Sequence, residues 1–286
     1  MARGGFDIPR QRLHNQYITR PFKGTPAELV KAMGAVQGQE YPFAKWGLGL
    51  RLGRTMRDAS LEAAFDAGEI LRTHVMRPTW HFVAADDVGW MQALTAERVL
   101  PVVRRQGIEP RVFTRATTIV ERALAGHRYH TRPELRVILE KAGIPLTPRE
   151  MNLVMLFAEL EGVVCSGPRR EKQFTYALVS ERAPNSRTLS RDEALAELTR
   201  RFFSSHGPAT VRDFVWWSGL RTSDARRGLQ MIGARSFVQD GLTYWIDPVA
   251  EPVAARRRGT LYLLPIYDEY LVAYRDRIAV PHGPSS

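Results

Sequence analysis

Three stretches of this 286-residue chain repeat one order of predicted elements. Each begins with a helix, continues with a second helix that starts at a threonine and a short third helix, and ends with two strand-like runs joined by a turn. The spacers between the elements vary, which indicates tandem domains rather than a solenoid of identical repeats. We therefore expect an α+β chain, mainly α, with three tandem winged-helix (helix-turn-helix) units at residues 6–84, 112–180 and 188–247, and a C-terminal segment at 259–277.

The middle stretch carries the clearest local signals. Two threonines, each with a glutamate three residues later, precede apolar runs: Thr131 with Glu134 and Thr147 with Glu150. This spacing is typical of a capping box, so both threonines predict helix starts. A Ser-Gly-Pro turn then separates residues 162–165 from the alternating run 173–179, which predicts a hairpin, or wing.

The other two stretches repeat this pattern with different turns. In the third, helices are predicted to begin at Thr210 and Thr222, and an Asp-Gly pair joins predicted strands at 236–238 and 242–246. In the first, the predicted helices and strands lie at 25–36, 43–52, 61–67, 70–75 and 79–83. Boundaries between units are expected at 109–114 and 182–187, because proline, asparagine and serine interrupt the periodic pattern there.

The composition favours a folded protein with a polyanionic partner. The chain has 41 basic and 30 acidic residues, a formal net charge of +11 that favours nucleic acid. The bias is weakened by the fact that 36 of the basic residues are arginine, as codon usage in a GC-rich genome also produces. A single cysteine, Cys165, and the absence of a signal-like apolar start predict a cytoplasmic, nucleoid-associated protein, and no apolar run is long enough for a membrane span.

Several kinds of chemistry find no support in the sequence. The closest histidine pair, His127 and His130, lies beside a predicted helix start, and its spacing does not match a metal site. The glycines after residue 46 do not fit a dinucleotide or phosphate loop, and no Gly-x-Ser-x-Gly elbow occurs. We expect no metal and no cofactor.

Candidate DNA contacts differ between the units. The third helix of the middle unit is apolar on nearly every face and carries Glu159 and Glu161, so it is unsuited to reading a major groove. Basic residues that could contact phosphates lie at the wing tip of the middle unit, at Arg169, Arg170 and Lys172. On the third unit, Arg226, Arg227 and Gln230 fall on a predicted helix and could contact DNA. A solvated basic surface explains either group equally well.

The sharpest polar pair lies in the first stretch, at Gln37 and Gln39. On a continuous helix two residues at this spacing point about 200 degrees apart. Gly38 between them and Pro42 after them predict that the helix ends here, so both amides can face one side. On spacing alone, two ordinary polar residues at a helix C-terminus are the favoured explanation of the pair.

Three segments resemble one known family. AVQGQEYPFAKWGLGLR, LRTHVMRPTWHFVAADDV and LLPIYDEYLVAYRDR are similar to segments of the AlkZ and YcaQ family of winged-helix DNA glycosylases, and the resemblance covers nearly the whole chain. It implies tandem winged-helix domains around a concave, basic DNA-binding channel, and hydrolysis of the N-glycosidic bond of N7-alkylated purines. The family's catalytic signature is a glutamine, an apolar residue and a second glutamine or an aspartate. Gln37 and Gln39 match its first form, with Gly38 in the middle position.

The resemblance also suggests which side chains line the channel. The candidates are Trp46, Arg51, Arg54, Arg77, Trp80 and His81. Four of them have another interpretation. The two tryptophans can belong to the core, Arg51 can close an ion pair, and His81 can form a hydrogen bond in the interior.

The C-terminal segment is expected to begin a β-rich region. Members of the family continue past the segment that resembles LLPIYDEYLVAYRDR, whereas this chain ends at Ser286, so we expect this region to be truncated, either by truncation of the gene or in a naturally shortened paralogue. Asp268, Glu269 and Asp276 are interpreted as structural anchors for it.

The expected function is that of a monofunctional DNA glycosylase acting as a monomer on double-stranded, preferably alkylated DNA, with interstrand cross-links as further substrates. The alternative is a non-catalytic winged-helix DNA-binding or transcriptional regulatory protein, because this fold binds DNA more often than it cuts a bond. A regulator would prefer one DNA sequence, and a glycosylase would prefer a lesion.

Overall fold

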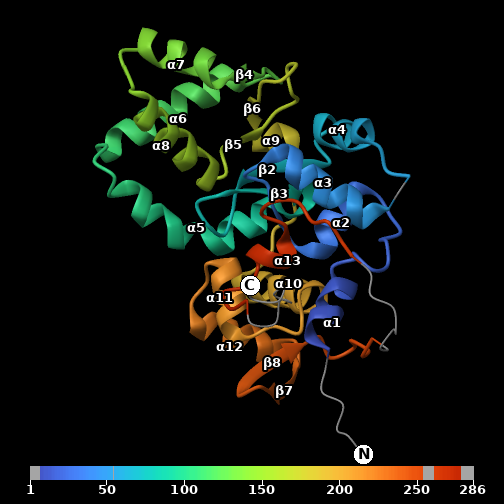
Figure 1. The fold of residues 1–286 in the computed structure, drawn as a ribbon. Helices are drawn as coiled ribbons and strands as arrows, with labels where there is room; N and C mark the ends of the chain where they lie inside the picture. The colour runs from blue at the N-terminus through green and yellow to red at the C-terminus, as the bar shows by residue number, and fades with distance from the viewer. Residues whose placement is uncertain (1–6, 54, 254–260, 278–286) are drawn as a thin grey trace, which may run out of the picture.

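The computed structural model describes residues 7–53, 55–253 and 261–277, and its helices and strands form three groups (Figure 1). Phe6, Arg54 and residues 259–260, on which some expectations rest, lie outside the described residues. Helix α1 (Ile8–Asn15) precedes the first group. The first group comprises α2 (Pro26–Met33), β1 (Val36–Gln37), α3 (Tyr41–Leu52), α4 (Asp58–Asp66), β2 (Ile70–His74) and β3 (Trp80–Ala84).

A long helix leads into the second group. The 3₁₀ turn η1 (Ala85–Asp87) and helix α5 (Val88–Arg104) form this connection, to which the sequence analysis assigns no element. The second group comprises α6 (Pro110–Leu124), β4 (His130–Thr131), α7 (Arg132–Lys141), α8 (Pro148–Leu160), β5 (Val164–Ser166), β6 (Thr175–Leu178) and the short α9 (Val179–Arg182).

The third group and one short helix complete the described chain. They comprise α10 (Arg191–Ser205), α11 (Val211–Ser218), α12 (Thr222–Met231), β7 (Arg235–Gln239), β8 (Leu242–Ile246) and α13 (Glu269–Val272). In each group a helix, two further helices and a closing hairpin follow in order, and a short extended segment after the first helix pairs with the last strand. The architecture is α+β, mainly helical, and this order is consistent with the winged-helix plan.

The predicted helix starts are confirmed. Thr25, Thr131, Thr147 and Thr210 each accept a hydrogen bond from the backbone N–H three residues later and form a complete capping box. The Asp240-Gly241 turn joins β7 to β8, with both residues at positive φ. These features depend on neighbouring residues only, which is why the sequence predicts them well.

Three local expectations are wrong. The interruption of regular structure expected at 109–114 is instead the start of a helix, because Pro110 occupies the first turn of α6, where a proline costs no hydrogen bond. The first helix ends at Met33 rather than near Val36, and β1 follows it. Residues 261–277 contain no strand, so the β-rich start expected there is absent from the described part of that segment, whose regular element is α13.

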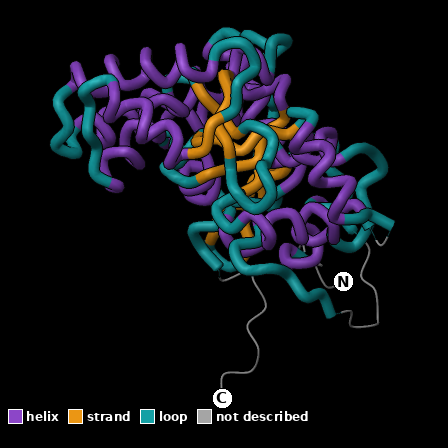
Figure 2. Tube along the Cα trace, turned by 90° about the horizontal axis from the view of Figure 1, so that it is seen from above, coloured by secondary structure: helices purple, strands orange, loops and turns teal. Residues whose placement is uncertain are grey.

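The first group lies in the middle of the molecule. Its sheet, in the order β1-β3-β2, contacts β5 of the second group through β2, and Figure 2 shows the strands gathered there with helices to either side. Helix α8 packs against β2 and α5. Helix α13 lies between the first and third groups (Figure 1). Among the described residues, no helix is long and apolar enough to cross a membrane.

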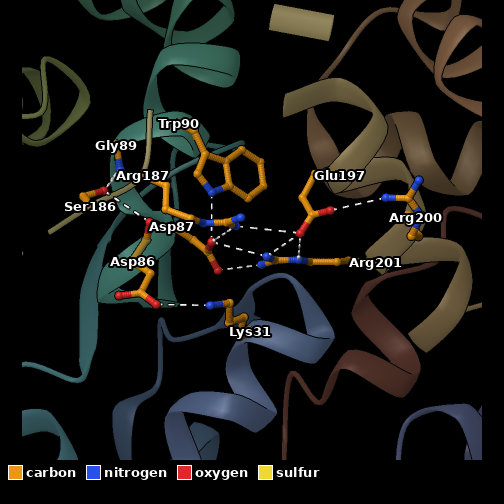
Figure 3. Close-up of polar contacts among 10 residues, drawn as sticks. All are labelled: Lys31, Asp86, Asp87, Gly89, Trp90, Ser186, Arg187, Glu197, Arg200 and Arg201. Carbon is orange, nitrogen blue, oxygen red and sulfur yellow. Dashed lines mark hydrogen bonds and ion pairs between the residues drawn. The ribbon is translucent and has the colours of Figure 1, made fainter. Parts of the chain in front are cut away.

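A buried ion-pair network joins the start of the connecting helix α5 to the third group (Figure 3). The Asp87 carboxylate, fully buried at the start of α5, accepts hydrogen bonds from Arg201 of α10 at 2.5 Å, Arg187 at 2.6 Å and the Trp90 indole at 2.9 Å. Burial opposes ionisation of Asp87, but these donors, Arg201 first, lower its pKa. The network fixes α10 beside the sheet that carries β1.

Candidate active site

The Gln37 to Gln39 segment starts on a strand. Gln37 ends β1, which pairs with the central strand β3, and Gln37 lies opposite His81 in the ladder. The Gly38 N–H then donates to the Trp80 carbonyl at 2.7 Å, and the chain turns into α3 at Tyr41. The prediction that the helix ends before the pair is therefore correct, and a two-residue strand that includes Gln37, too short to leave a sequence pattern, follows the helix.

Gly38 lies against an aromatic ring. A Cβ atom on Gly38 would stand 2.9 Å from two ring carbons of Phe82, closer than side chains tolerate. The Phe82 ring is fully buried and packs edge-on against Phe65 and Tyr41, with ring centroids 4.6 Å and 5.6 Å away. The ring thus occupies the space that an apolar side chain at position 38 would need.

The two glutamine side chains are free to bind a ligand. Gln37 and Gln39 are both half-buried, and among the described residues neither amide group forms a hydrogen bond. An amide can accept through its oxygen and donate through its nitrogen, so this pair can hold a water and face a positive charge.

One side of the segment is held by Glu269 of α13. Its carboxylate is 1% exposed and accepts the Gln37 N–H at 2.6 Å and the Trp217 indole N–H at 3.0 Å, and His206 Nε2 lies 3.3 Å away. Burial alone raises the pKa of such a carboxyl, but His206 and the Gln37 N–H outweigh it and lower the pKa to about 2. Glu269 is therefore a carboxylate at neutral pH.

The other side is held by Arg72 of β2. Its Nε donates to the Gly38 carbonyl at 2.8 Å and its Nη2 to the Gln39 carbonyl at 3.3 Å. The guanidinium lies between two aromatic rings, 4.2 Å from the centroid of Trp80 and 4.5 Å from that of Phe174. Burial lowers the pKa of Arg72 to about 10, which leaves it charged at neutral pH.

Comparisons with known proteins point to one family. A family model described as DNA glycosylase AlkZ-like matches residues 30–282. The chain belongs to this family. It is 24% identical over 279 residues to the "Interstrand DNA cross-link repair glycosylase" of Streptomyces sahachiroi, covering 91% of this chain and 75% of that protein. The solved structure of Streptomyces sahachiroi DNA glycosylase AlkZ has a similar fold, with a TM-score of 0.72 at 20% identity over 86% of this chain and 72% of that one.

Some residues that the AlkZ-like resemblance assigned to the DNA channel lie in the interior. Arg51 is 2% exposed and forms a two-hydrogen-bond ion pair with Asp268, at 2.8 and 2.7 Å, so its expected DNA contact is wrong. Its ion-pair interpretation is correct, and Asp268 anchors the C-terminal segment to α3. His81 is fully buried, and its Nδ1 lies 2.8 Å from the Thr79 carbonyl. Burial lowers the pKa of His81 to about 3, so it is neutral and out of reach of DNA.

The β2–β3 turn of the first group packs against the third group. Arg77, in this turn, is half-buried and lies over the Trp216 ring, 5.5 Å from its centroid. Burial lowers the pKa of Arg77. The residue serves the contact between the two groups, and a DNA contact remains a prediction for its partly exposed face.

The wing tip of the second group is engaged with two helices. Arg169 pairs with Glu62 of α4 at 3.1 Å, and Arg170 pairs with Glu134 of α7 at 2.7 Å. Lys172 is exposed and has no ion-pair partner among the described residues. Trp46 is 59% exposed on α3, beside a cavity of about 810 Å³ that Leu50 and Leu263 also line. Contacts of Arg170, Lys172 and Trp46 with DNA remain predictions.

Sequence reasoning missed Arg72 as a functional residue and interpreted Glu269 only as an anchor. Neither has a local signal. Arg72 lies on β2, where every residue is buried and no alternation marks it out, and Glu269 is 232 residues from Gln37. A single sequence carries no local pattern showing that the Arg72 and Glu269 side chains contact the Gln37 to Gln39 backbone.

Proposed function

We propose that this chain is a monofunctional DNA glycosylase that hydrolyses the N-glycosidic bond of N7-alkylated purines, interstrand cross-links among them. The observation that carries the proposal is the pair of partly exposed, unpaired amides at Gln37 and Gln39 on a backbone held by buried charged groups. The related glycosylase of Streptomyces sahachiroi is named for cross-link repair, which supports the same substrate class.

The chemistry needs no strong acid. Alkylation at N7 makes the purine cationic, so it leaves without being protonated, and a sugar with oxocarbenium character remains to be stabilised and hydrated. In this proposal the Gln37 side-chain oxygen accepts a hydrogen bond from the attacking water and directs its negative dipole end toward the sugar. Gln39 orients the water or the first amide. Such modest assistance selects lesions that are already activated and leaves undamaged purines intact.

The proposed partner is double-stranded DNA, bound by a monomer. Phosphate contacts are assigned to exposed basic side chains such as Lys172 and Arg170, on the grounds of their exposure and charge. In this proposal these residues border a concave channel. The reaction requires no metal and no cofactor, since water and a cationic leaving group supply its chemistry.

The test is base release. The full chain is incubated with duplex DNA carrying N7-methylguanine, and free 7-methylguanine is measured alongside the abasic sites left behind. We expect the wild type to release 7-methylguanine and to leave an equal amount of abasic sites. If no base is released and the protein instead protects one sequence of undamaged DNA, the chain is a regulator and the proposal is wrong.

A further inference from the structure

The backbone of the Gln37 to Gln39 segment is held at three successive residues. The Gln37 N–H donates to Glu269, the Gly38 N–H donates to Trp80 and its carbonyl accepts from Arg72, and the Gln39 carbonyl accepts from Arg72 as well. The bond to Trp80 belongs to the strand pairing of the first group. The other three come from two charged side chains that are 9% exposed or less.

These two side chains have opposite charges and approach from opposite parts of the molecule. Glu269 belongs to α13 and is oriented by Trp217 and His206 of the third group. Arg72 belongs to the sheet and is oriented by Trp80 and by Phe174, which precedes β6 of the second group. The segment therefore takes its conformation from all three groups at once.

The Glu269 carboxylate and the Arg72 guanidinium are well suited to fixing a backbone. A hydrogen bond to a charged group is roughly twice as strong as one between neutral groups, and burial prevents water from competing for it. An unpaired charge at either position would be costly, so each side chain holds its peptide partner firmly. Within the segment, Glu269 and Arg72 hydrogen-bond only to main-chain atoms. They therefore leave the side-chain amides of Gln37 and Gln39 unoccupied.

We propose that Glu269 and Arg72 are positioning residues for base release, and that they fix the Gln37 to Gln39 backbone so that both amides face the same reacting sugar. This inference rests on the proposed function and adds the device that aligns its two amides. Misplacement of a catalytic group by about 1 Å costs on the order of 100-fold in rate, so the loss of one holding contact is measurable.

The experiment compares two isosteric replacements of Glu269. Both are made in a Trp217→Phe background, which removes the indole N–H that would oppose an amide nitrogen. Glu269→Gln retains an oxygen that accepts the Gln37 N–H, and Glu269→Met does not. Both remove the charge beside His206, so they differ in the amide group, whose oxygen can accept the Gln37 N–H. The Trp217→Phe protein is the reference for both.

Two readouts are measured below the unfolding temperature of every variant. The first is the single-turnover rate of 7-methylguanine release at saturating enzyme, with the enzyme concentration for half-maximal rate. The second is hydrogen exchange of the Gln37 backbone N–H. We expect Glu269→Met to lower the maximal rate about 100-fold, with an unchanged half-maximal concentration and faster exchange. Glu269→Gln should restore most of the rate and of the protection. A merely structural role would reduce the active fraction of both variants alike.

Arg72 provides an independent comparison if Glu269→Met does not fold. Arg72→Met removes both donors while its side chain still fits between Trp80 and Phe174, and Arg72→Lys retains one donor. We expect about a 10-fold to 100-fold loss of maximal rate for Arg72→Met and a smaller loss for Arg72→Lys. In a Gln39→Ala background the Arg72→Met loss should shrink, because the misplaced amide is already absent.

The outcomes separate the two proposals. Absence of base release by the wild type overturns the proposed glycosylase activity. Hydrogen exchange of the Gln37 backbone N–H still tests the positioning contact in that case. An active wild type whose maximal rate survives both Glu269→Met and Arg72→Met overturns the positioning role. Equal losses in Glu269→Gln and Glu269→Met also overturn it, since the acceptor would then make no difference.

Discussion

The Phe82 ring fills the space beside Gly38 in the candidate site, because a Cβ on Gly38 would lie 2.9 Å from that ring. The AlkZ-like signature has an apolar side chain between its two polar residues, and this chain has none there. The Phe82 ring fills the equivalent volume from the neighbouring strand, and Tyr41 and Phe65 hold that ring in place. A glycine between the two glutamines is therefore compatible with a well-packed site.

Gly38→Ala should disturb both stability and activity. The added methyl group must displace either the Phe82 ring or the Gln37 to Gln39 backbone, at a cost of about 1–3 kcal/mol in the free energy of unfolding. Urea unfolding and single-turnover base release measure the two effects. Gly49→Ala on α3 is the control, since its Cβ would meet only one atom, 4.0 Å away, and it should stabilise the helix by about 0.5–1 kcal/mol. Combining Gly38→Ala with Phe82→Leu should recover part of the loss. Unchanged stability and rate in Gly38→Ala would show that the contact is unimportant.

Gln37→Ala should slow base release without weakening DNA binding. One preorganised polar group contributes about 2–4 kcal/mol to lowering a barrier, and Gln37 is assigned both the water and the sugar contact. Gln39→Ala should raise the barrier by less than Gln37→Ala if Gln39 only orients the water or the Gln37 amide. Single-turnover rates are compared on DNA that all proteins bind equally. A Gln37→Ala rate equal to wild type would remove Gln37 from the mechanism. Trapping of a protein–DNA adduct by borohydride would show an imine intermediate and contradict a monofunctional enzyme.

Lys172→Ala should weaken DNA binding uniformly across undamaged sequences. An exposed ammonium that neutralises one phosphate contributes about one unit to the slope of log affinity against log salt concentration. Binding is measured by fluorescence anisotropy at several salt concentrations. Lys31→Ala is the control, because the Lys31 ammonium already pairs with Asp86 at 3.1 Å. Sequence-specific binding that persists at high salt would favour the regulator.

Acid should destabilise the protein through Asp87. Its pKa is lowered in the folded state, so its ionic contacts contribute fully above the unfolded pKa of about 4, and this contribution is lost as the pH falls through the folded pKa. Asp87→Asn should cost about 3 kcal/mol at pH 7, and the difference from wild type should shrink as the pH falls below about 4. Urea unfolding between pH 7 and pH 3 measures this.

The neighbouring Asp86 is a matched control for Asp87. Its side chain is 55% exposed and pairs with Lys31, so Asp86→Asn should cost less than about 1 kcal/mol at any pH. Both residues appear in Figure 3, one inside the network and one at its edge. A pH-independent difference between wild type and Asp87→Asn would contradict the ionic interpretation.

The sequence by itself determined the local elements of this protein. Capping boxes at Thr131 and Thr147 and the Asp240-Gly241 turn involve residues no more than three positions apart, so their hydrogen bonds follow from the residue types alone. The Gln37 and Gln39 pair was also visible, because a motif is a property of adjacent residues.

Only the tertiary structure decided what surrounds that pair. Glu269 and Arg72 reach its backbone from segments that are distant in the sequence, and Arg51 forms an ion pair with Asp268 instead of facing a channel. The described residues 261–277 of the C-terminal segment are held by such buried charge pairs and contain no strand. Contacts of this kind depend on how three groups of helices pack together, and packing is set by the shapes and charges of whole surfaces, which leave no periodic pattern along the chain.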